Sequence, residues 1–130
     1  MGRFSYDADF DPQAPYIDAE VETLAPGGPS PKQVRMLIDS GSFVTAVPQK
    51  SLKAIGVYES DYGTCYCQGF EGAVIERKTY MVKLRFADQD QLLEVVPINE
   101  KFGLIGRDLL NDLKTTLGGP DEGWDFEPIR

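Results

Sequence analysis

The sequence predicts a mostly β fold in a single small domain, and three observations favour it. Apolar and polar residues alternate along several segments, as they do in half-buried strands. Nine prolines and thirteen glycines are scattered between the apolar runs and indicate many turns. The chain has 130 residues, which is long enough to bury one core but too short for two lobes.

The first part of the chain is expected to hold two long strands and their connections. Residues 16–24 alternate between apolar or small residues and acids, which predicts a half-buried antiparallel strand. Residues 33–39 resume the alternation and run directly into the turn Ser40-Gly41-Ser42. Prolines and glycines make residues 25–31 a loop. Residues 1–13 are expected as an N-terminal arm, either an edge strand or a loose segment.

The rest of the chain follows from the same patterns. An alternation over residues 80–86 predicts a strand that pairs with residues 92–98 across a polar turn at 87–91. Three leucines fall on one face of a short helix expected at 107–114. The remaining expectations are β-rich residues 43–47, a short helix at 48–55, an aperiodic stretch at 57–72, a short strand at 115–117 and an acidic C-terminal tail at 119–130.

Composition argues against several classes of function. Twenty-one acidic residues face thirteen basic ones, so neither nucleic acid nor an anionic membrane is expected as a partner. No apolar run approaches the roughly 18 residues of a membrane span, and no signal segment follows Arg3, so a cytoplasmic location is expected. The absence of histidine excludes His-dependent catalysis and His-ligated zinc. Cys65 and Cys67 are expected as reduced thiols, and no metal or cofactor is expected.

Asp39 is the candidate catalytic residue. It follows the apolar run Met36-Leu37-Ile38 and precedes Ser40-Gly41, at the end of an expected buried strand. A carboxylate in that place must be paired, hydrogen-bonded or protonated, because an isolated buried charge is costly. An Asx-turn at a strand end, with no catalytic role, is the alternative interpretation.

Two motifs in order resemble those of one enzyme family. The first is the apolar pair followed by Asp39-Ser40-Gly41-Ser42, and the second is Leu104-Ile105-Gly106-Arg107-Asp108-Leu109-Leu110. Together they resemble the retroviral-type aspartic peptidases, which are the retropepsins and their single-domain prokaryotic relatives. The resemblance covers residues 14–118. It implies a closed acid-protease barrel with one short C-terminal helix, active as a symmetric homodimer.

The chemistry of carboxylates agrees with this resemblance. Peptide hydrolysis by carboxyl groups needs two of them sharing a proton, one as general base on water and one as general acid to the carbonyl. The chain contains no second Asp-Ser/Thr-Gly sequence. The second carboxyl group is therefore expected from Asp39 of another copy across a two-fold axis. The expected activity is that of an aspartic endopeptidase acting on a peptide or protein substrate.

The resemblance also implies roles for neighbouring residues. Ser40 would reach across the two-fold axis, and Gly41 would let the backbone approach the substrate closely. We expect the Ser42 hydroxyl to donate to the outer carboxylate oxygen of Asp39 and so favour the ionised form. A mobile flap is expected at Gly69, Phe70, Glu71 and Gly72, with a plain β-turn as the alternative.

Two departures from the family pattern leave questions open. Phe43 stands where viral relatives often carry an acid paired with the Arg of the second motif. Arg107 is therefore expected to bond a backbone carbonyl or an acidic residue of the other chain. The tail 119–130 either adds a strand to the dimer interface or hangs free, and Trp124 and Phe126 favour docking.

Two other functions remain open at the level of the sequence. The chain could be a catalytically silent dimeric β-barrel that binds peptides or proteins without cleaving them. It could also be a different carboxylate enzyme, such as a glycoside hydrolase that uses Asp39 and a second acid of the same chain. The small size and the turn motif argue against the glycoside hydrolase.

Overall fold

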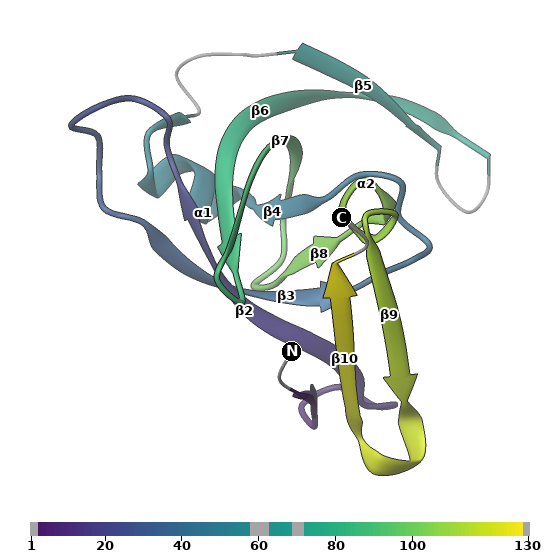
Figure 1. Cartoon of the computed structure of the whole chain (residues 1–130). Coiled ribbons are helices and arrows are strands. Elements are labelled where there is room, and N and C mark those ends of the chain that lie inside the picture. The colour runs from purple at the N-terminus through teal and green to yellow at the C-terminus, as the bar shows by residue number, and fades with distance from the viewer. Residues whose placement is uncertain (1–2, 58–62, 69–71, 129–130) are drawn as a thin grey trace.

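The computed structural model describes residues 3–57, 63–68 and 72–128, and strands dominate it (Figure 1). The elements are β1 (Phe4–Asp7), β2 (Ala14–Glu22), β3 (Lys32–Ile38), β4 (Ala46–Pro48), α1 (Gln49–Ala54), β5 (Gly63–Gln68), β6 (Val74–Phe86), β7 (Gln89–Ile98), β8 (Gly103–Ile105), α2 (Arg107–Leu110), β9 (Leu113–Gly118), the 3-10 turn η2 (Gly119–Asp121) and β10 (Gly123–Pro128). The mostly β prediction is confirmed. Within the described ranges, no helix has the length and apolar character of a membrane span.

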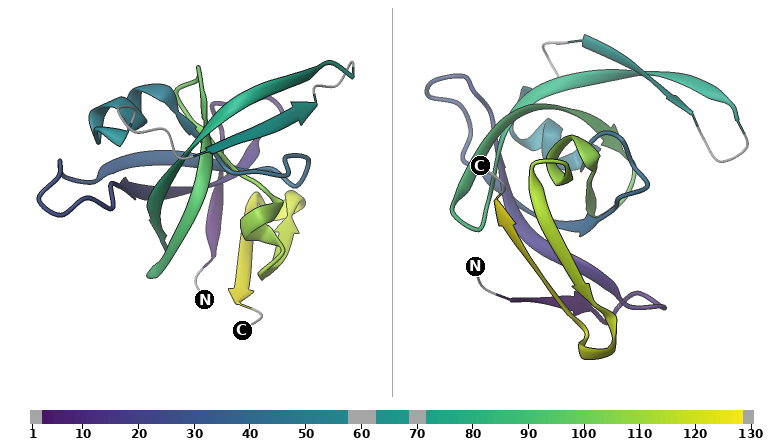
Figure 2. Two further views of the ribbon diagram at one scale, coloured as in Figure 1. Left: turned by 90° about the horizontal axis from the view of Figure 1, so that it is seen from above. Right: turned by 45° about the vertical axis from the view of Figure 1, so that its right-hand side comes forward.

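The described strands form one sheet in the order β5-β6-β7-β4-β8-β3-β2-β1-β10-β9, with a further pairing between β6 and β2. Most neighbours are antiparallel, whereas β3 with β8 and β4 with β7 are parallel. Because β6 pairs with both β7 and β2, the sheet folds back on itself, and Figure 2 shows β6 and β7 as strongly curved ribbons. This topology brings the ends of β3 and β8 together, where the two sequence motifs lie.

The alternation predicted for residues 16–24 is confirmed by the burial pattern of β2. Ile17, Ala19 and Val21 are buried, whereas Asp18 and Glu20 are exposed. β6 repeats this pattern over its second half, which packs against β2 and β7. The inward-facing side chains of the sheet form one core, and its largest fully buried members include Trp124, Phe126, Met36, Leu52, Ile55, Leu84 and Ile105.

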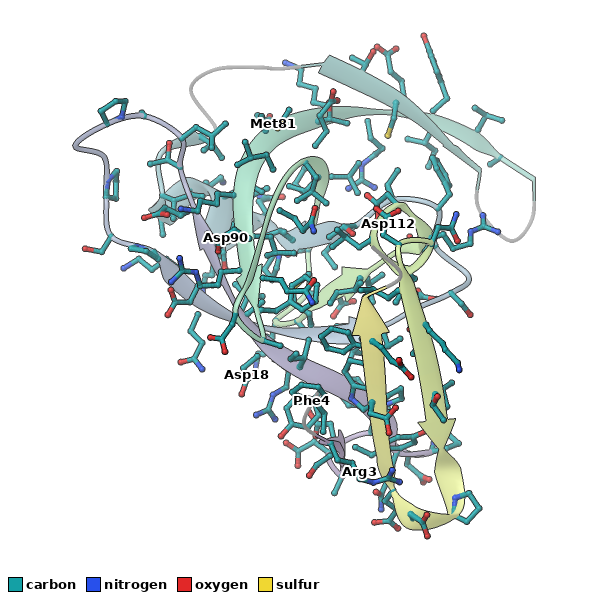
Figure 3. The ribbon with its side chains drawn as sticks, viewed as in Figure 1. Arg3, Phe4, Asp18, Met81, Asp90 and Asp112 are labelled. Atoms are coloured by element: carbon teal, nitrogen blue, oxygen red, sulfur yellow. The ribbon has the colours of Figure 1, made fainter. Side chains whose placement is uncertain are left out.

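The C-terminal segment belongs to this core. β10 pairs with β1 on one side and with β9 on the other, so residues 4–7 of the expected arm and residues 123–128 of the expected tail lie in the sheet. The Trp124 indole is 1% exposed, and its Nε1 donates a hydrogen bond of 2.8 Å to Tyr16 O. The ring of Phe4 lies 5.0 Å from Trp124 and 5.7 Å from Phe126, and Figure 3 shows Phe4 beside β10. The described part of the tail therefore packs into the sheet of its own chain and does not hang free, whereas a strand added to a dimer interface stays a prediction.

Four boundaries differ from the predictions, each for a local reason. The helix expected at 107–114 ends at Leu110, because the chain enters β9 and pairs with β10. The turn expected at 87–91 is only Ala87-Asp88, and both residues have positive φ, as two-residue hairpin turns with the right twist require. Only the end of the β-rich stretch 43–47 is a strand, since the preceding residues form a loop. The aperiodic stretch 57–72 contains β5.

Candidate active site

Asp39 follows the last residue of β3, where the structure fixes both its backbone and its side chain. Ile38 pairs with Ile105 of β8, and the Asp39 N–H donates a hydrogen bond of 3.0 Å to Ile105 O. Gly41 N donates to Asp39 Oδ1 at 2.9 Å, and Ser42 N donates to Asp39 O at 3.2 Å. The anticipated Asx-turn is therefore present. This turn uses one carboxylate oxygen of Asp39, a half-buried residue, and fixes the orientation of its side chain.

The second motif holds the loop that follows Asp39. Arg107 N donates to Ser42 O at 2.8 Å. Thr45 donates twice to Asp108, from its backbone N to Oδ2 at 2.9 Å and from its hydroxyl to Oδ1 at 2.7 Å. Gly106 N in turn donates to the Thr45 hydroxyl at 3.2 Å. The structure thus brings residues 39–45 together with residues 105–108. We call the hydrogen bonds between these two segments the clamp.

Thr45 is a member of the clamp that sequence reasoning missed. A threonine within residues 43–47 indicates only a preference for strand, and nothing in the sequence shows which acid it bonds. Its side chain is fully buried, so its hydroxyl needs partners inside the protein. Asp108 and Gly106 supply them.

Gly106 is required by close approach rather than by an unusual backbone conformation. A Cβ atom at this position would contact Val44 O and would lie 2.6 Å from Val44 C and 2.9 Å from Ser42 O. These are backbone atoms of the loop after Asp39, so they cannot move away by a side-chain rotation. Gly41 is less crowded, because its Cβ would meet only Asp39 Oδ1, at 3.1 Å.

One expected contact is corrected by the structure. The Ser42 hydroxyl donates a hydrogen bond of 2.6 Å to Val44 O and not to the carboxylate of Asp39. The loop conformation places that carbonyl within reach, and a hydroxyl has a single proton to donate. Ser42 therefore supports the turn through a backbone carbonyl. The predicted hydrogen bond from its hydroxyl to the Asp39 carboxylate is not formed.

Phe43 and Arg107, the two residues of the first departure from the family pattern, both lie on the surface. Phe43 is 44% exposed, close in sequence to Asp39. Arg107 is exposed, and its guanidinium makes neither an ion pair nor a hydrogen bond with any residue in the described part of the chain. The alternative that Arg107 bonds a backbone carbonyl of its own chain is thus not observed among these residues.

The expected flap lies in sequence between β5 and β6, which pair with each other. β5 and β6 pair from Gly63↔Thr79 to Gln68↔Val74, and this pair projects from the body of the molecule (Figures 1 and 2). Of the predicted flap residues, Gly72 is described and has φ of 86°, whereas 69–71 lie outside the described residues. The root of the hairpin is tied to β7, since the Thr79 hydroxyl donates to Glu94 Oε2 at 2.6 Å.

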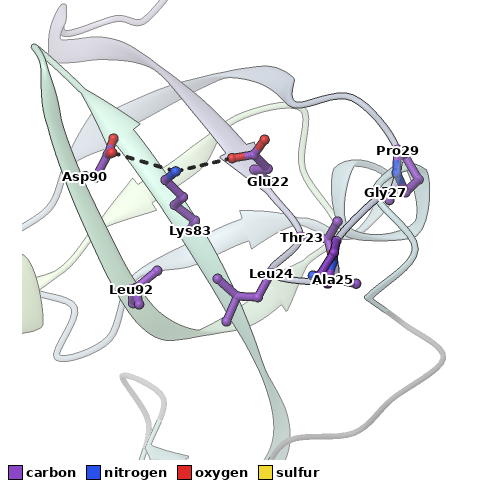
Figure 4. Close-up of a pocket in the computed structure, with 11 residues that line it drawn as sticks. Glu22, Thr23, Leu24, Ala25, Gly27, Pro29, Lys83, Asp90 and Leu92 are labelled. Carbon is purple, nitrogen blue, oxygen red and sulfur yellow. Dashed lines mark hydrogen bonds and ion pairs between the residues drawn. The ribbon is translucent and has the colours of Figure 1, made fainter.

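The hollow shown in Figure 4 does not contain Asp39. It has a volume of about 630 Å³ and lies between the loop 23–29 and the β6–β7 hairpin, at the opposite end of β3. Lys83 Nζ lies between Glu22 Oε1 at 3.6 Å and Asp90 Oδ2 at 3.7 Å, so the only cation among its lining residues is already paired. None of the candidate residues of either motif lines this hollow.

Comparison with known proteins identifies the fold. The sequence matches no protein-family model, and no curated protein is similar to it in sequence. Solved structures do match. The EIAV protease complexed with the inhibitor HBY-793 has a TM-score of 0.59 at 14% identity over 76% of this chain and 86% of that chain. The solution structure of the simian foamy virus (mac) protease has a TM-score of 0.53 at 18% identity over 74% of this chain and 91% of that chain.

The chain has the retropepsin-like fold. A third structure, of the foamy viral protease-reverse transcriptase in complex with an RNA/DNA hybrid, agrees, with a TM-score of 0.57 at 16% identity. It covers 79% of this chain but 12% of that longer chain. At this level of identity the likeness shows the fold alone.

Proposed function

We propose that this chain is an aspartic endopeptidase that works as a homodimer, with one Asp39 from each copy. The observation that carries the proposal is the geometry of the turn after β3. Asp39 directly follows this strand, its carboxylate accepts a hydrogen bond from Gly41 N at 2.9 Å, and the second motif holds the loop that follows. A retropepsin-like fold surrounds this turn. Fold and fixed carboxyl group together favour peptide hydrolysis over the other open functions.

The proposed reaction needs only two carboxyl groups and one water molecule. The ionised Asp39 takes a proton from water while the water oxygen bonds to the peptide carbonyl carbon. The protonated Asp39 of the other copy gives its proton to the carbonyl oxygen. Collapse of the resulting diol breaks the C–N bond. The leaving nitrogen takes its proton from the carboxyl group that had deprotonated water, and one diol hydroxyl gives its proton to the other carboxylate, so both groups return to their starting states. The two groups are copies of one residue related by the two-fold axis, so either can act as the base and neither subunit holds a fixed role.

Hydrogen bonds around the turn supply what this chemistry needs from the protein. The Asx-turn leaves Asp39 Oδ2 without a partner among the described residues, so that this oxygen is available to water or to the second carboxyl group. The exposed β5–β6 hairpin is the proposed lid over a bound peptide, since exclusion of water strengthens interactions inside the site. Tyr66, Val74 and Ile75 give the hairpin apolar surface for that contact.

The decisive experiment is Asp39→Asn, because asparagine keeps the acceptor that Gly41 N requires and removes only the acid. We expect cleavage of an unfolded protein at pH 4–6 to fall at least about 100-fold, the range of general acid–base contributions. The matched control is Asp88→Asn in the β6–β7 turn, where φ is 64° and asparagine is well tolerated.

The result also separates the competing functions. Equal cleavage by the wild type and by Asp39→Asn would eliminate the proposed pair of carboxyl groups. Peptide binding without cleavage by the wild type would instead favour the silent binding protein. A chain that cleaves while sedimenting as a monomer at every concentration would contradict the shared site.

A further inference from the structure

Basic side chains gather around a second hollow, which lies where β4 and β7 end. It has a volume of about 380 Å³, and its lining includes three lysines, Lys50, Lys53 and Lys101, but only one acid, Glu100. The chain as a whole carries a net charge of −8. The lining of this hollow, which we call the basic hollow, is therefore opposite in charge to the rest of the molecule.

The pairing of two parallel strands places these lysines together. Pro48 at the end of β4 pairs with Ile98 at the end of β7, so both strands end at the same edge. The chain leaves β4 directly into α1 (Figure 1), which carries Lys50 and Lys53 three residues apart and thus on one helix face. It leaves β7 into the loop that carries Lys101. The basic hollow lies between these two departing segments.

The core holds the backbone on the helical side of the basic hollow. Leu52 of α1 is fully buried, and Ile55 directly after the helix is 1% exposed. Both side chains belong to the single core of the sheet. Lys50 and Lys53 are exposed at the surface of this anchored helix. A ligand therefore meets lysines whose backbone is already ordered, which lowers the entropy lost on binding.

Two of the three lysines lack a counter-charge within the chain. The ammonium groups of Lys50 and Lys101 make neither an ion pair nor a hydrogen bond with any residue that the structure describes. The Glu100 carboxylate likewise forms no ion pair within the described ranges. In the hollow of Figure 4, by contrast, Lys83 lies between two carboxylates. The cations of the basic hollow are thus available to an anion from outside.

The remaining lining groups and the size favour a peptide over other anions. The amides of Gln49 and Asn99 can both donate and accept hydrogen bonds, as peptide groups require, and Ile98 adds a half-buried apolar wall. The volume lies within the range of about 300–1,000 Å³ that is usual for ligand pockets. A nucleic acid or an anionic membrane would extend beyond the basic hollow over the acidic remainder of the surface, which would repel it.

We propose that the basic hollow binds a short acidic segment of a partner protein, whose neighbouring Asp or Glu side chains pair with Lys50 and Lys101. The site is separate from Asp39. β4 leads from Thr45 of the clamp to α1, and three extended residues span about 10 Å. Because binding here breaks no bond, the inference goes beyond the proposed function and does not depend on it.

Direct binding to the full chain tests the inference. The probe is the peptide Gly-Glu-Glu-Glu-Gly with blocked termini and an uncharged fluorophore, and the matched neutral peptide is Gly-Gln-Gln-Gln-Gly. Fluorescence anisotropy is measured on Asp39→Asn, so that the proposed carboxyl pair cannot cleave either peptide. We expect saturable binding of the acidic peptide, at least about tenfold tighter than that of the neutral one and weaker in high salt.

Substitution of single lysines assigns the binding to the basic hollow. We expect Lys50→Gln and Lys101→Gln each to raise the dissociation constant of the acidic peptide roughly two- to fivefold, the range measured for exposed ion pairs. The matched control is Lys32→Gln. Lys32 is an exposed lysine at the start of β3 that forms no ion pair with the described residues, and its substitution should leave the constant unchanged. Circular dichroism checks that all three variants are folded.

Protection from acetylation locates the peptide without any substitution. Saturating acidic peptide should slow the acetylation of Lys50 and Lys101, followed by mass spectrometry, and should leave that of Lys32 unchanged. Unaltered affinity in both lysine variants without protection would overturn the inference, as would equal binding of the two peptides. Displacement by inorganic phosphate, with no binding of the acidic peptide in its absence, would also overturn it. A wild type that binds the peptide but never cleaves a protein would overturn only the proposed function.

Discussion

At Gly106 the backbone passes so close to the loop after Asp39 that a single methyl group does not fit. We expect Gly106→Ala to lower the free energy of unfolding by about 1–3 kcal/mol, the usual cost of overpacking a site that cannot yield. Cleavage should fall as well, because the displaced loop carries Asp39. Urea unfolding of the two proteins measures the first effect.

The matched control for this substitution is Gly119→Ala. A Cβ atom at Gly119 has no neighbour within 4 Å, and its φ is not in the left-handed region. We expect this variant to unfold at the same urea concentration as the wild type or slightly above it. Equal stability of Gly106→Ala and Gly119→Ala would contradict the close approach.

Single residues were predictable from the sequence where their partners lie nearby in the chain. The turn at Asp39 follows from the tripeptide, because Gly41 N is two residues away. The prediction that the Ser42 hydroxyl donates to Asp39 was wrong, because its actual acceptor, Val44 O, depends on how the loop up to Val44 folds. Thr45 was missed because its partner Asp108 is distant in sequence and is brought near only by the pairing of β3 with β8.

Among the elements, the β6–β7 hairpin carries an ion pair whose effect depends on pH. Arg85 and Asp90 lie opposite each other, and Arg85 Nε donates to Asp90 Oδ1 at 2.7 Å. This hydrogen bond lowers the pKa of Asp90 below its ordinary value of 3.8. A carboxyl group with a lowered pKa in the folded state adds stability above the pKa of the unfolded chain and loses it as the pH falls through the folded pKa.

We therefore expect Asp90→Asn to be less stable than the wild type at pH 7, with the difference shrinking below about pH 4. Both partners are exposed, so the difference should be small and should weaken further in high salt. Urea unfolding at pH 7 and pH 3 measures it. Asp88→Asn in the adjacent turn is the control. A difference that grows on acidification would have the wrong sign for this ion pair.

Strands and helices were predictable where burial imposes a period. β2 and the second half of β6 lie with one face on the core, so their alternation is visible in the sequence. β5 was missed because its exposed residues, such as Thr64 and Tyr66, have no core to alternate against. The helix after Gly106 was overextended, because the leucines that suggested a helical face continue into β9.

At the scale of the whole molecule, the retropepsin-like fold followed from two motifs, whereas the extent of the folded unit did not. An acidic composition suggested a tail at 119–130, yet in the described part of that segment η2 leads into β10, which lies in the sheet between β1 and β9. The signal was Trp124 and Phe126, two large apolar residues that need burial. Their destination depends on β1 and β2, which are distant in sequence.

The fluorescence of the single tryptophan can show whether the C-terminal hairpin unfolds together with the rest of the sheet. Trp124 packs against Phe4 and Phe126 and bonds Tyr16 O, so it joins both ends of the chain to β2. Because these contacts belong to the one core, we expect Trp124 fluorescence and the far-ultraviolet circular dichroism of the sheet to change at the same urea concentration, as in a two-state transition. A C-terminal hairpin that docks only weakly would release Trp124 first, at a lower urea concentration than the loss of strand signal. Two separated transitions would therefore show that β10 unfolds independently of the core.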